Sequence, residues 1–325
     1  MKLAQLGEFG LIDRIKAKVA ASPSVPIGIG DDAAALLPTP GTVTLITSDM
    51  LLEGVHFDLS FCDPQSLGRK SLSVNLSDLA AMGAQPRQFL LSIALPAEIP
   101  LEFLDGFMTG VMEQAERFGV TLVGGDTCAS KGGLAISITA LGEQRPERVV
   151  TRSGALPGDL ICVSGSVGDA AAGLAELRRG VREGGLVSRQ LDPQPRVELG
   201  VALAELGLAS AMIDVSDGVL ADLGHICEMS GVGARLDLGK LPLSDQYRAA
   251  CGADPYAMAL SGGEDYELLF CVPRTAAAGL EVLFARLGIT VSLIGEITDG
   301  DGVALVAADG GAYTAARRGF NHFGS

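Results

Sequence analysis

Residues 101–141, LEFLDGFMTGVMEQAERFGVTLVGGDTCASKGGLAISITAL, combine one helix pattern with two strand patterns. Apolar residues recur at helical spacing over 101–118. A short strand at 121–123 then enters a Gly-Gly-Asp turn, and residues 134–141 alternate between polar and apolar side chains. Such alternation favours open mixed or antiparallel sheets with helices packed on one face, rather than a buried parallel sheet. We therefore expect an α+β fold.

The same mixture continues on both sides of this stretch. The further predicted helices cover 8–20, 65–82, 169–179, 195–206, 218–230 and 275–287, and the further strands cover 43–47, 89–95, 160–163, 211–214, 234–238, 268–272, 290–297 and 303–307. Residues 143–158, EQRPERVVTRSGALPG, are polar and interrupted by Pro and Gly, which is typical of a domain boundary. We expect two domains, 1–145 and 146–325.

The composition limits the classes of ligand. The 325 residues include 24 Lys and Arg against 39 Asp and Glu, a formal charge of −15, while 48% of residues are hydrophobic. The high apolar content excludes a disordered chain. The negative charge disfavours nucleic acid and anionic membranes as partners, and it repels small anions unless a cation mediates.

Neither a membrane segment nor a cysteine-based metal site is predicted. No apolar run reaches the roughly 18 residues of a membrane span, and Glu8, Asp13 and Arg14 interrupt the first segment, unlike a signal peptide. The six cysteines have no metal-ligand spacing, so we interpret them as small buried residues of a protein in a reducing, cytoplasmic compartment. They are Cys62, Cys128, Cys162, Cys227, Cys251 and Cys271.

One glycine-rich motif is misleading. Residues 28–33, GIGDDA, formally match the dinucleotide-binding fingerprint. Two aspartates would repel a pyrophosphate there, and Pro38 and Pro40 leave too little room for the helix that the fingerprint requires. The phosphate-binding loop, HExxH and GxSxG motifs are absent from the sequence.

Aspartates beside glycines or small polar residues recur along the chain. They lie in Gly30-Asp31-Asp32, Thr47-Ser48-Asp49, Asn75-Leu76-Ser77-Asp78, Gly124-Gly125-Asp126-Thr127, Asp214-Val215-Ser216-Asp217-Gly218 and Gly262-Gly263-Glu264-Asp265. Each alone is also explained as a turn former or a helix N-cap, and Asp217 before Gly218 is a good N-cap candidate. Asp78 differs, because it lies inside an otherwise apolar helix and needs a partner there.

Taken together, these acids indicate hard cations. Mg²⁺ prefers carboxylate and water oxygens and usually lies between a few aspartates and substrate phosphates. Glycine beside each acid allows the backbone to approach a ligand closely. Carboxylates facing ATP would be repulsive without metal, whereas with several Mg²⁺ ions they form a phosphoryl-transfer site.

These segments resemble the thiamine-monophosphate kinase family, in the superfamily of aminoimidazole ribonucleotide synthetase and selenophosphate synthetase. The segments that carry the resemblance are GEFGLI (7–12), GIGDDAA (28–34), TSDMLLEGVHF (47–57), SVNLSDLAAMGAQP (73–86), GGDT (124–127), TRSGALPGD (151–159), IDVSDG (213–218), SGGEDYELLF (261–270) and GFNHF (319–323). The resemblance implies two aminoimidazole ribonucleotide synthetase-like domains, the first binding ATP and Mg²⁺ and dimerising, the second completing the active site. It also implies a homodimer that phosphorylates thiamine monophosphate to thiamine diphosphate with ATP.

The resemblance assigns a role to each matched residue. The implied metal ligands are Asp32, Thr47, Ser48, Asp49, Asp78, Asp126, Asp214 and Asp217, and the implied catalytic group consists of Asp49, Asp78, Asp126 and Asp214. The implied ATP contacts are Gly125, Asp126, Arg152 and Ser216, and the implied substrate contacts are His56, Glu264 and Phe320. The chain has no Trp, so Phe320 is left to stack on thiamine. Asp31 and Asp265 lie beside matched positions, and either support a matched residue or have no part in the site.

The acceptor favours a direct transfer. A phosphate monoester has a second pKa of about 6, so it is mainly a dianion at neutral pH and needs no strong general base. We expect in-line transfer from ATP without a phospho-enzyme. Two alternatives stay open: another ATP-dependent member of the superfamily, acting on an amide or ribonucleotide, and a non-catalytic nucleotide- or divalent-cation-binding regulator.

Overall fold

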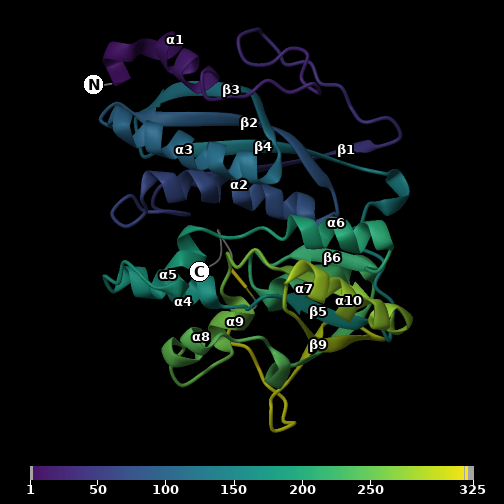
Figure 1. Ribbon diagram of the computed structural model, residues 1–325. Helices are drawn as coiled ribbons and strands as arrows, with labels where there is room; N and C mark the ends of the chain where they lie inside the picture. Colours follow the sequence, from purple (N-terminus) through teal and green to yellow (C-terminus); the bar gives the residue numbers. More distant parts are fainter. Residues whose placement is uncertain (1–2, 318, 321–325) are drawn as a thin grey trace. The chain divides into compact units, whose positions relative to one another are not determined.

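The computed structural model describes residues 3–317, 319 and 320, and the chain divides into two compact units (Figure 1). The N-terminal unit consists of Met1–Leu79 and Gln85–Pro146, and the C-terminal unit consists of Ala80–Ala84 and Glu147–Ser325. Among the described residues, no helix combines the length and the apolar character that a membrane crossing requires. Each unit is described below by itself.

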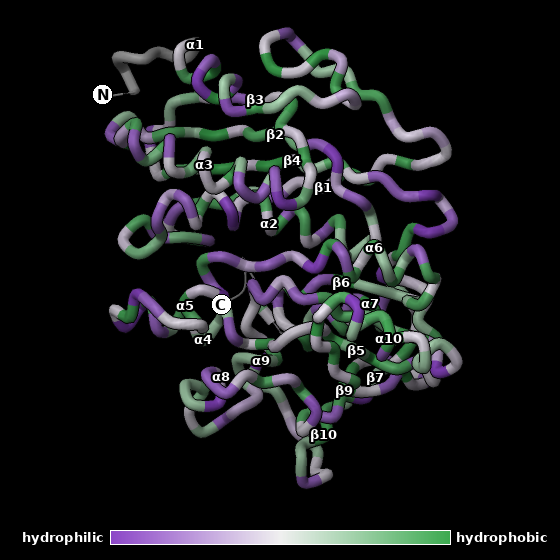
Figure 2. The backbone as a smooth tube through the Cα atoms, viewed as in Figure 1, coloured by the Kyte–Doolittle hydropathy of each residue, from purple (hydrophilic) through white to green (hydrophobic). Residues whose placement is uncertain are grey.

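The N-terminal unit is built on a four-stranded mixed sheet. Its elements are α1 (Leu3–Lys16), β1 (Val43–Leu52), α2 (Pro64–Ala81, which extends past the unit), β2 (Gln85–Pro96), α3 (Leu101–Phe118), β3 (Thr121–Ser130), β4 (Ala135–Gln144) and a 3₁₀ turn (Pro146–Arg148) at its end. The strand order is β1-β4-β2-β3. Strand β4 runs antiparallel to β1 and β2, whereas β2 and β3 are parallel. Figure 2 shows β2 and β4 as mostly hydrophobic.

Helices α2 and α3 approach each other backbone to backbone. A Cβ at Gly68 of α2 would lie 2.0 Å from the carbonyl oxygen of Phe107, and one at Gly110 of α3 would lie 1.9 Å from that of Gln65. Only glycine fits at such contacts. This close packing fixes α2, whose Asn75 and Asp78 face strand β1 through the hydrogen bonds described below.

The C-terminal unit is built on a six-stranded mixed sheet. Its strands are β5 (Leu160–Ser164), β6 (Ala211–Asp214), β7 (Gly233–Asp237), β8 (Leu268–Val272), β9 (Val291–Thr298) and β10 (Val303–Val306). Its helices are α4 (Asp169–Arg178), α5 (Gly185–Leu191), α6 (Val197–Leu206), α7 (Val219–Ser230), α8 (Asp245–Ala250), α9 (Ala257–Ser261) and α10 (Ala277–Leu287), with 3₁₀ turns at Leu238–Lys240 and Arg274–Ala276. The strand order is β10-β7-β9-β5-β8-β6, and only β10 and β7 are parallel. Strand β8 is buried at all five positions.

The two mixed sheets with their helices confirm the predicted α+β class. The predicted strands of this N-terminal sheet are all too short: β1 continues to Leu52, β2 begins at Gln85, β3 continues to Ser130 and β4 to Gln144. Strand β4 pairs with the whole of β1, and β2 pairs with the whole of β3. This pairing outweighs the weak strand preference of Gly and Asp. Asp49 and Asp126 therefore lie inside strands rather than at their ends.

The remaining differences concern short or terminal elements. Helix α1 begins and ends earlier than the predicted 8–20 and stops at Lys16. Helices α5, α8 and α9 are not predicted, because runs of five to seven residues show too little periodicity. Four of the six cysteines are buried as predicted, whereas Cys128 is exposed on β3 and Cys251 is half-buried.

Candidate active site

In the N-terminal unit, three predicted metal ligands meet where β1 faces α2. The Thr47 hydroxyl donates a short hydrogen bond to Asp78 Oδ2. The backbone N–H of Asp49, two residues further along β1, donates to Asn75 Oδ1 at 3.1 Å. Alternate residues of a strand share a face, and residues three apart on a helix share a face, so the sequence spacing brings these groups together. Asp78 has the partner that its place in an apolar helix requires.

The acids of this group destabilise each other's charge. Burial, and then the nearby Asp78 carboxylate, raise the pKa of Asp49 to about 7. A divalent cation would remove this penalty, and two carboxylates with a hydroxyl are oxygen donors of the kind that Mg²⁺ takes. The residues fit a magnesium ion. Among the residues that the structure describes, however, no three or more His, Cys, Asp or Glu side chains gather closely enough to hold a metal ion.

Asp126 does not join this group. Across the sheet, Asp126 of β3 pairs with Ser92 of β2, Ser92 pairs with Ser137 of β4, and Ser137 pairs with Met50 of β1. Asp126 and Met50 therefore lie in the same cross-strand row and point to the same face. Asp49 is the residue before Met50 on β1, and successive residues of a strand point to opposite faces. Asp49 and Asp126 therefore point to opposite faces of the sheet. Strands β1 and β3 are also three strand spacings apart, about 14 Å. Ser48 lies on the face away from Asp49, where its hydroxyl is 2.9 Å from that of Thr139.

Gly125 is fixed by its neighbour strand. Its φ is 152°, and a Cβ there would lie 1.7 Å from the carbonyl oxygen of Leu91, so no other residue fits. The predicted ATP contact at Gly125 thus also has a packing reason to be glycine.

Two further predicted residues of this unit lie apart from the Thr47 group. Asp32 is exposed in the loop before β1, and its backbone N–H donates to Asp31 Oδ1 at 2.9 Å. His56 closes the turn after β1, where its Nδ1 accepts a hydrogen bond of 3.0 Å from the backbone N–H of Leu52.

In the C-terminal unit, the loop after β6 and the segment before β8 run side by side. The backbone N–H of Glu264 donates to Ser216 O at 2.9 Å, and that of Tyr266 donates to Val215 O at 2.9 Å. Val215 in turn donates to Glu267 O at 2.8 Å. These bonds bring Ser216, a predicted ATP contact, next to Glu264, a predicted contact of the acceptor. Asp214 lies buried at the end of β6, directly before this loop.

Asp222, which is not predicted as a site residue, anchors the same loop from helix α7. Its Oδ2 accepts hydrogen bonds of 3.1 Å from the backbone N–H groups of Ser216, Asp217 and Gly218. Burial, and then the charge of Asp217, raise the pKa of Asp222 to about 7 despite these bonds. The predicted N-cap role of Asp217 is wrong, because Gly218, at a φ of 109°, precedes the helix and makes no side-chain cap bond.

The C-terminal segment reaches this loop. The backbone N–H of Phe320 donates to Asp217 O at 3.0 Å, and the Phe320 side chain is 54% exposed. The preceding Gly319 packs close to Ala221, since a Cβ there would lie 2.5 Å from the Ala221 Cβ. Residues 321–323 of the matched terminal segment lie outside the described residues.

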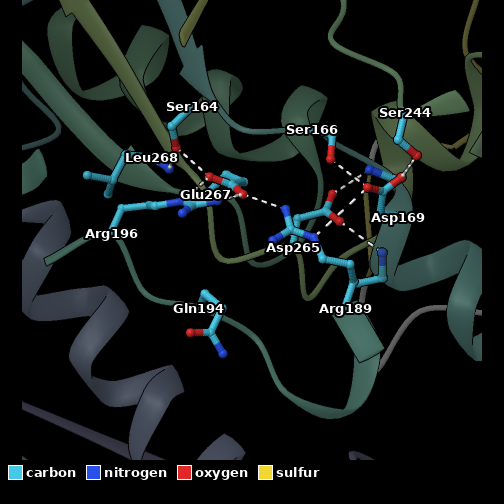
Figure 3. A network of polar contacts seen from close by, with 12 residues as sticks. Ser164, Ser166, Asp169, Arg189, Gln194, Arg196, Ser244, Asp265, Glu267 and Leu268 are labelled. Carbon is cyan, nitrogen blue, oxygen red and sulfur yellow. Dashed lines mark hydrogen bonds and ion pairs between the residues drawn. The ribbon is translucent and has the colours of Figure 1, made fainter. Parts of the chain in front are cut away.

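Glu264 is held in an unusual backbone conformation. The φ of Glu264 is 69° and that of Tyr266 is 50°, and residues other than glycine rarely adopt such values. Gln190 Nε2 of α5 donates to Glu264 Oε2 at 2.5 Å. The next two acids are buried: Asp265 accepts from the backbone N–H groups of Gly168 and Ala170, and Glu267 binds Arg189 and Arg196 (Figure 3).

The Arg152 backbone is tied to the C-terminal end of helix α7. The Arg152 carbonyl oxygen accepts a hydrogen bond of 3.3 Å from Ser230, the last residue of α7. The loop that carries Ser216 and Asp217 lies at the other end of this 12-residue helix, about 18 Å away. Within this unit, the structure therefore brings Asp214, Ser216, Asp217, Glu264 and Phe320 together. The residue before Arg152 pairs with β6, because the backbone N–H of Met212 donates to Thr151 O at 3.0 Å.

Both family models that match the chain describe AIR synthase related proteins. The N-terminal domain model matches residues 30–144, and the C-terminal domain model matches residues 157–308. The thiamine-monophosphate kinase of Escherichia coli strain K12 is 42% identical over 327 residues, which cover 98% of both chains.

Solved structures agree with these matches. The crystal structure of thiamine-monophosphate kinase from Stenotrophomonas maltophilia K279a superposes with a TM-score of 0.85, at 40% identity over 96% of this chain and 99% of that one. The structure of AaThiL complexed with AMPPCP and TMP has a TM-score of 0.78, at 36% identity over 99% of both chains.

Proposed function

The chain belongs to the thiamine-monophosphate kinase family, and on that premise we propose that it phosphorylates thiamine monophosphate to thiamine diphosphate with ATP. A solved relative that is 36% identical over 99% of this chain binds AMPPCP and TMP, which supports both substrates. The observation that carries the proposal is that three segments far apart in the sequence meet at the start of helix α7. They bring Ser216 and Asp217 next to Glu264 and Phe320.

The acceptor is proposed to lie against Glu264 and Phe320. The thiazolium ring of thiamine is cationic, and both an aromatic face and a carboxylate favour a cation. The Phe320 side chain is 54% exposed, and the bond from Gln190 orients the Glu264 carboxylate. His56 is the third proposed acceptor contact, and the hydrogen bond from the Leu52 N–H to its Nδ1 orients the ring.

Magnesium is proposed as the cofactor of both units. In the N-terminal unit Thr47, Asp49 and Asp78 would hold an ion, with Asp126, Ser48 and Asp32 contributing at other positions. In the C-terminal unit Asp214 and Asp217 would do so. Bound Mg²⁺ neutralises the charge of the polyphosphate and orients it for attack. Asp49 and Asp126 lie on strands about 14 Å apart and point to opposite faces of the sheet, which favours more than one ion.

The transfer is proposed to be direct. The acceptor phosphate is mainly a dianion near neutral pH and attacks the γ-phosphorus of ATP without a general base, as ADP leaves. Gly125, Asp126, Arg152 and Ser216 are the proposed ATP contacts, and Arg152 adds a fixed positive charge. The protein is proposed to act in the cytoplasm as a homodimer. Sedimentation at micromolar concentration tests the dimer, and a monomer there would count against it.

The test of the transfer uses ATP labelled with ³²P at the γ-phosphate. We expect the label in thiamine diphosphate and none on the protein after an acid quench during turnover. Labelled protein that forms and decays at the rate of turnover would contradict direct transfer. Label that appears only as inorganic phosphate would contradict the proposed function itself.

A further inference from the structure

The tetrapeptide Glu264-Asp265-Tyr266-Glu267 alternates between strained backbone and buried acids. Among the described residues, Glu264 and Tyr266 are the two non-glycine residues with positive φ. Such conformations persist only where the surrounding structure holds them firmly, and they concentrate at functional sites. Asp265 and Glu267, the two acids of the tetrapeptide that are buried, supply that support.

Glu267 supplies the strongest part of this support. Its side chain is fully buried, and Arg196 binds it through two nitrogens. Nε donates to Oε2 at 2.6 Å, and Nη2 donates to Oε1 at 2.5 Å. Arg189 Nη2 donates to Oε1 at 2.5 Å, and the Ser164 hydroxyl donates to Oε2 at 2.6 Å. A bidentate guanidinium fixes both the position and the orientation of a carboxylate. Figure 3 shows this arrangement.

The same network reaches Glu264 through helix α5. Arg189 binds Glu267, while its neighbour Gln190 binds Glu264, so one turn of α5 holds both ends of the tetrapeptide. Asp265 holds the middle, with Oδ2 accepting from the Gly168 N–H at 2.6 Å and Oδ1 from the Ala170 N–H at 3.1 Å. The strained backbone is thus fixed at three of the four residues of the tetrapeptide.

Two glycines leave room for this network and for the loop of Ser216. A Cβ at Gly165 would lie 2.1 Å from Glu267 Oε1, and one at Gly263 would lie 2.1 Å from the carbonyl oxygen of Ser216. Arg189 and Arg196 are 25% and 21% exposed, so they reach the buried acid from the unit's surface. The network thus connects α5 and the segment before α6 to the loop of Ser216.

We propose that Glu267, Arg196, Arg189 and Gln190 are positioning residues that set the specificity for the thiamine-phosphate acceptor, by fixing Glu264 in its left-handed conformation beside Ser216. This inference rests on the proposed function. The network acts through Glu264 and makes no contact of its own with the acceptor. Asp222 holds the loop of Ser216 independently of this network, so loosening the network weakens the use of the acceptor and leaves the use of ATP nearly unchanged.

The test compares Arg196→Lys with Arg235→Lys in steady-state kinetics. Lysine keeps the charge but cannot form the bidentate pair. Arg235 makes an exposed ion pair of 3.2 Å with Glu296 in the same unit, so it is the matched control. We expect Arg196→Lys to raise KM for thiamine monophosphate by about tenfold or more, with KM for ATP within twofold, and Arg235→Lys to change neither. Equal rises in both KM values, or no rise in either, would overturn the proposal.

Gln190→Met keeps the proposal testable if Arg196→Lys does not fold. Methionine has a similar volume but no donor for Glu264, so we expect the same selective rise in KM for the acceptor. Crystals of this variant should show a changed Glu264 conformation; an unchanged Glu264 with an unchanged KM would refute the positioning role. Absence of thiamine diphosphate formation by the unmodified chain would instead refute the proposed function, so the two failures are distinguishable.

Discussion

The backbone N–H of Phe320 donates a 3.0 Å hydrogen bond to the carbonyl oxygen of Asp217. This bond joins a proposed acceptor contact to a proposed metal ligand that lies about a hundred residues earlier in the chain. Because Phe320 is held through its backbone, its ring remains free to be changed without loss of the bond. The side chain at position 320 can therefore be tested independently of the tie to Asp217.

Phe320→Ala should raise KM for thiamine monophosphate about fivefold or more, because it removes the aromatic face for the thiazolium cation. Phe320→Trp should keep KM at or below its original value, since indole is the better partner of a cation. Steady-state kinetics at saturating ATP provide the measurement. If Ala, Phe and Trp give the same KM, the ring does not stack on the acceptor.

Asp49→Asn should lower turnover by about 100-fold or more, as removal of a group that stabilises transferring charge does. The same change should raise the melting temperature of the metal-free protein, because it removes a buried carboxylate that the Asp78 charge opposes. Added Mg²⁺ should stabilise the original chain more than the variant. Asp13→Asn, at an exposed position of the same unit, is the control. Near-native turnover of Asp49→Asn at saturating Mg²⁺ would exclude Asp49 as a metal ligand.

Asp222→Ala should lower the free energy of unfolding by about 2–4 kcal/mol, because three backbone N–H groups lose a shared acceptor. It should also raise KM for Mg²⁺, since Asp217 lies on the loop that these bonds hold. Asp222→Asn retains an acceptor oxygen and should lose less. Glu228→Ala, at an exposed position of the same helix, should change stability by about 0.5 kcal/mol or less. Urea denaturation of the three variants checks the order.

Asp265 should make stability depend on pH. Burial raises its pKa from 3.8 to about 7, so between these values the folded state binds more protons than the unfolded state. The free energy of unfolding should therefore fall as the pH rises from about 4 to 7, with a slope of at most about 1.4 kcal/mol per pH unit from this group. Asp265→Asn should flatten that slope in urea titrations across this range. An unchanged slope would show that Asp265 does not titrate there.

Long periodic elements could be predicted from the sequence. Helix α3 spans the predicted 101–118 because its apolar face repeats over five turns and Gly119 ends it in a left-handed conformation. Strand β8 spans the predicted 268–272, a run that is buried throughout. Strands β1 and β3 could not be delimited in the same way, because their ends are set by partners that lie far away in the sequence.

The site was predictable only where a residue type indicates chemistry by itself. The recurring aspartates beside glycines or small polar residues suggested metal binding, which stays a prediction. Asp78 lies near enough to Asp49 for its charge to raise the pKa of Asp49. Asp222 and Glu267 gave no such signal, because their role depends on loops and arginines that folding brings to them. The opposite orientation of Asp49 and Asp126 likewise depends on strand register, which spacing within one segment does not reveal.

The central claim is phosphorylation of thiamine monophosphate by ATP. The most direct test incubates the purified chain with ATP, Mg²⁺ and thiamine monophosphate, and quantifies thiamine diphosphate and ADP by chromatography. The account predicts one thiamine diphosphate for each ADP, with neither product formed when Mg²⁺ is chelated. Formation of ADP without thiamine diphosphate, or no ADP at all, would contradict it.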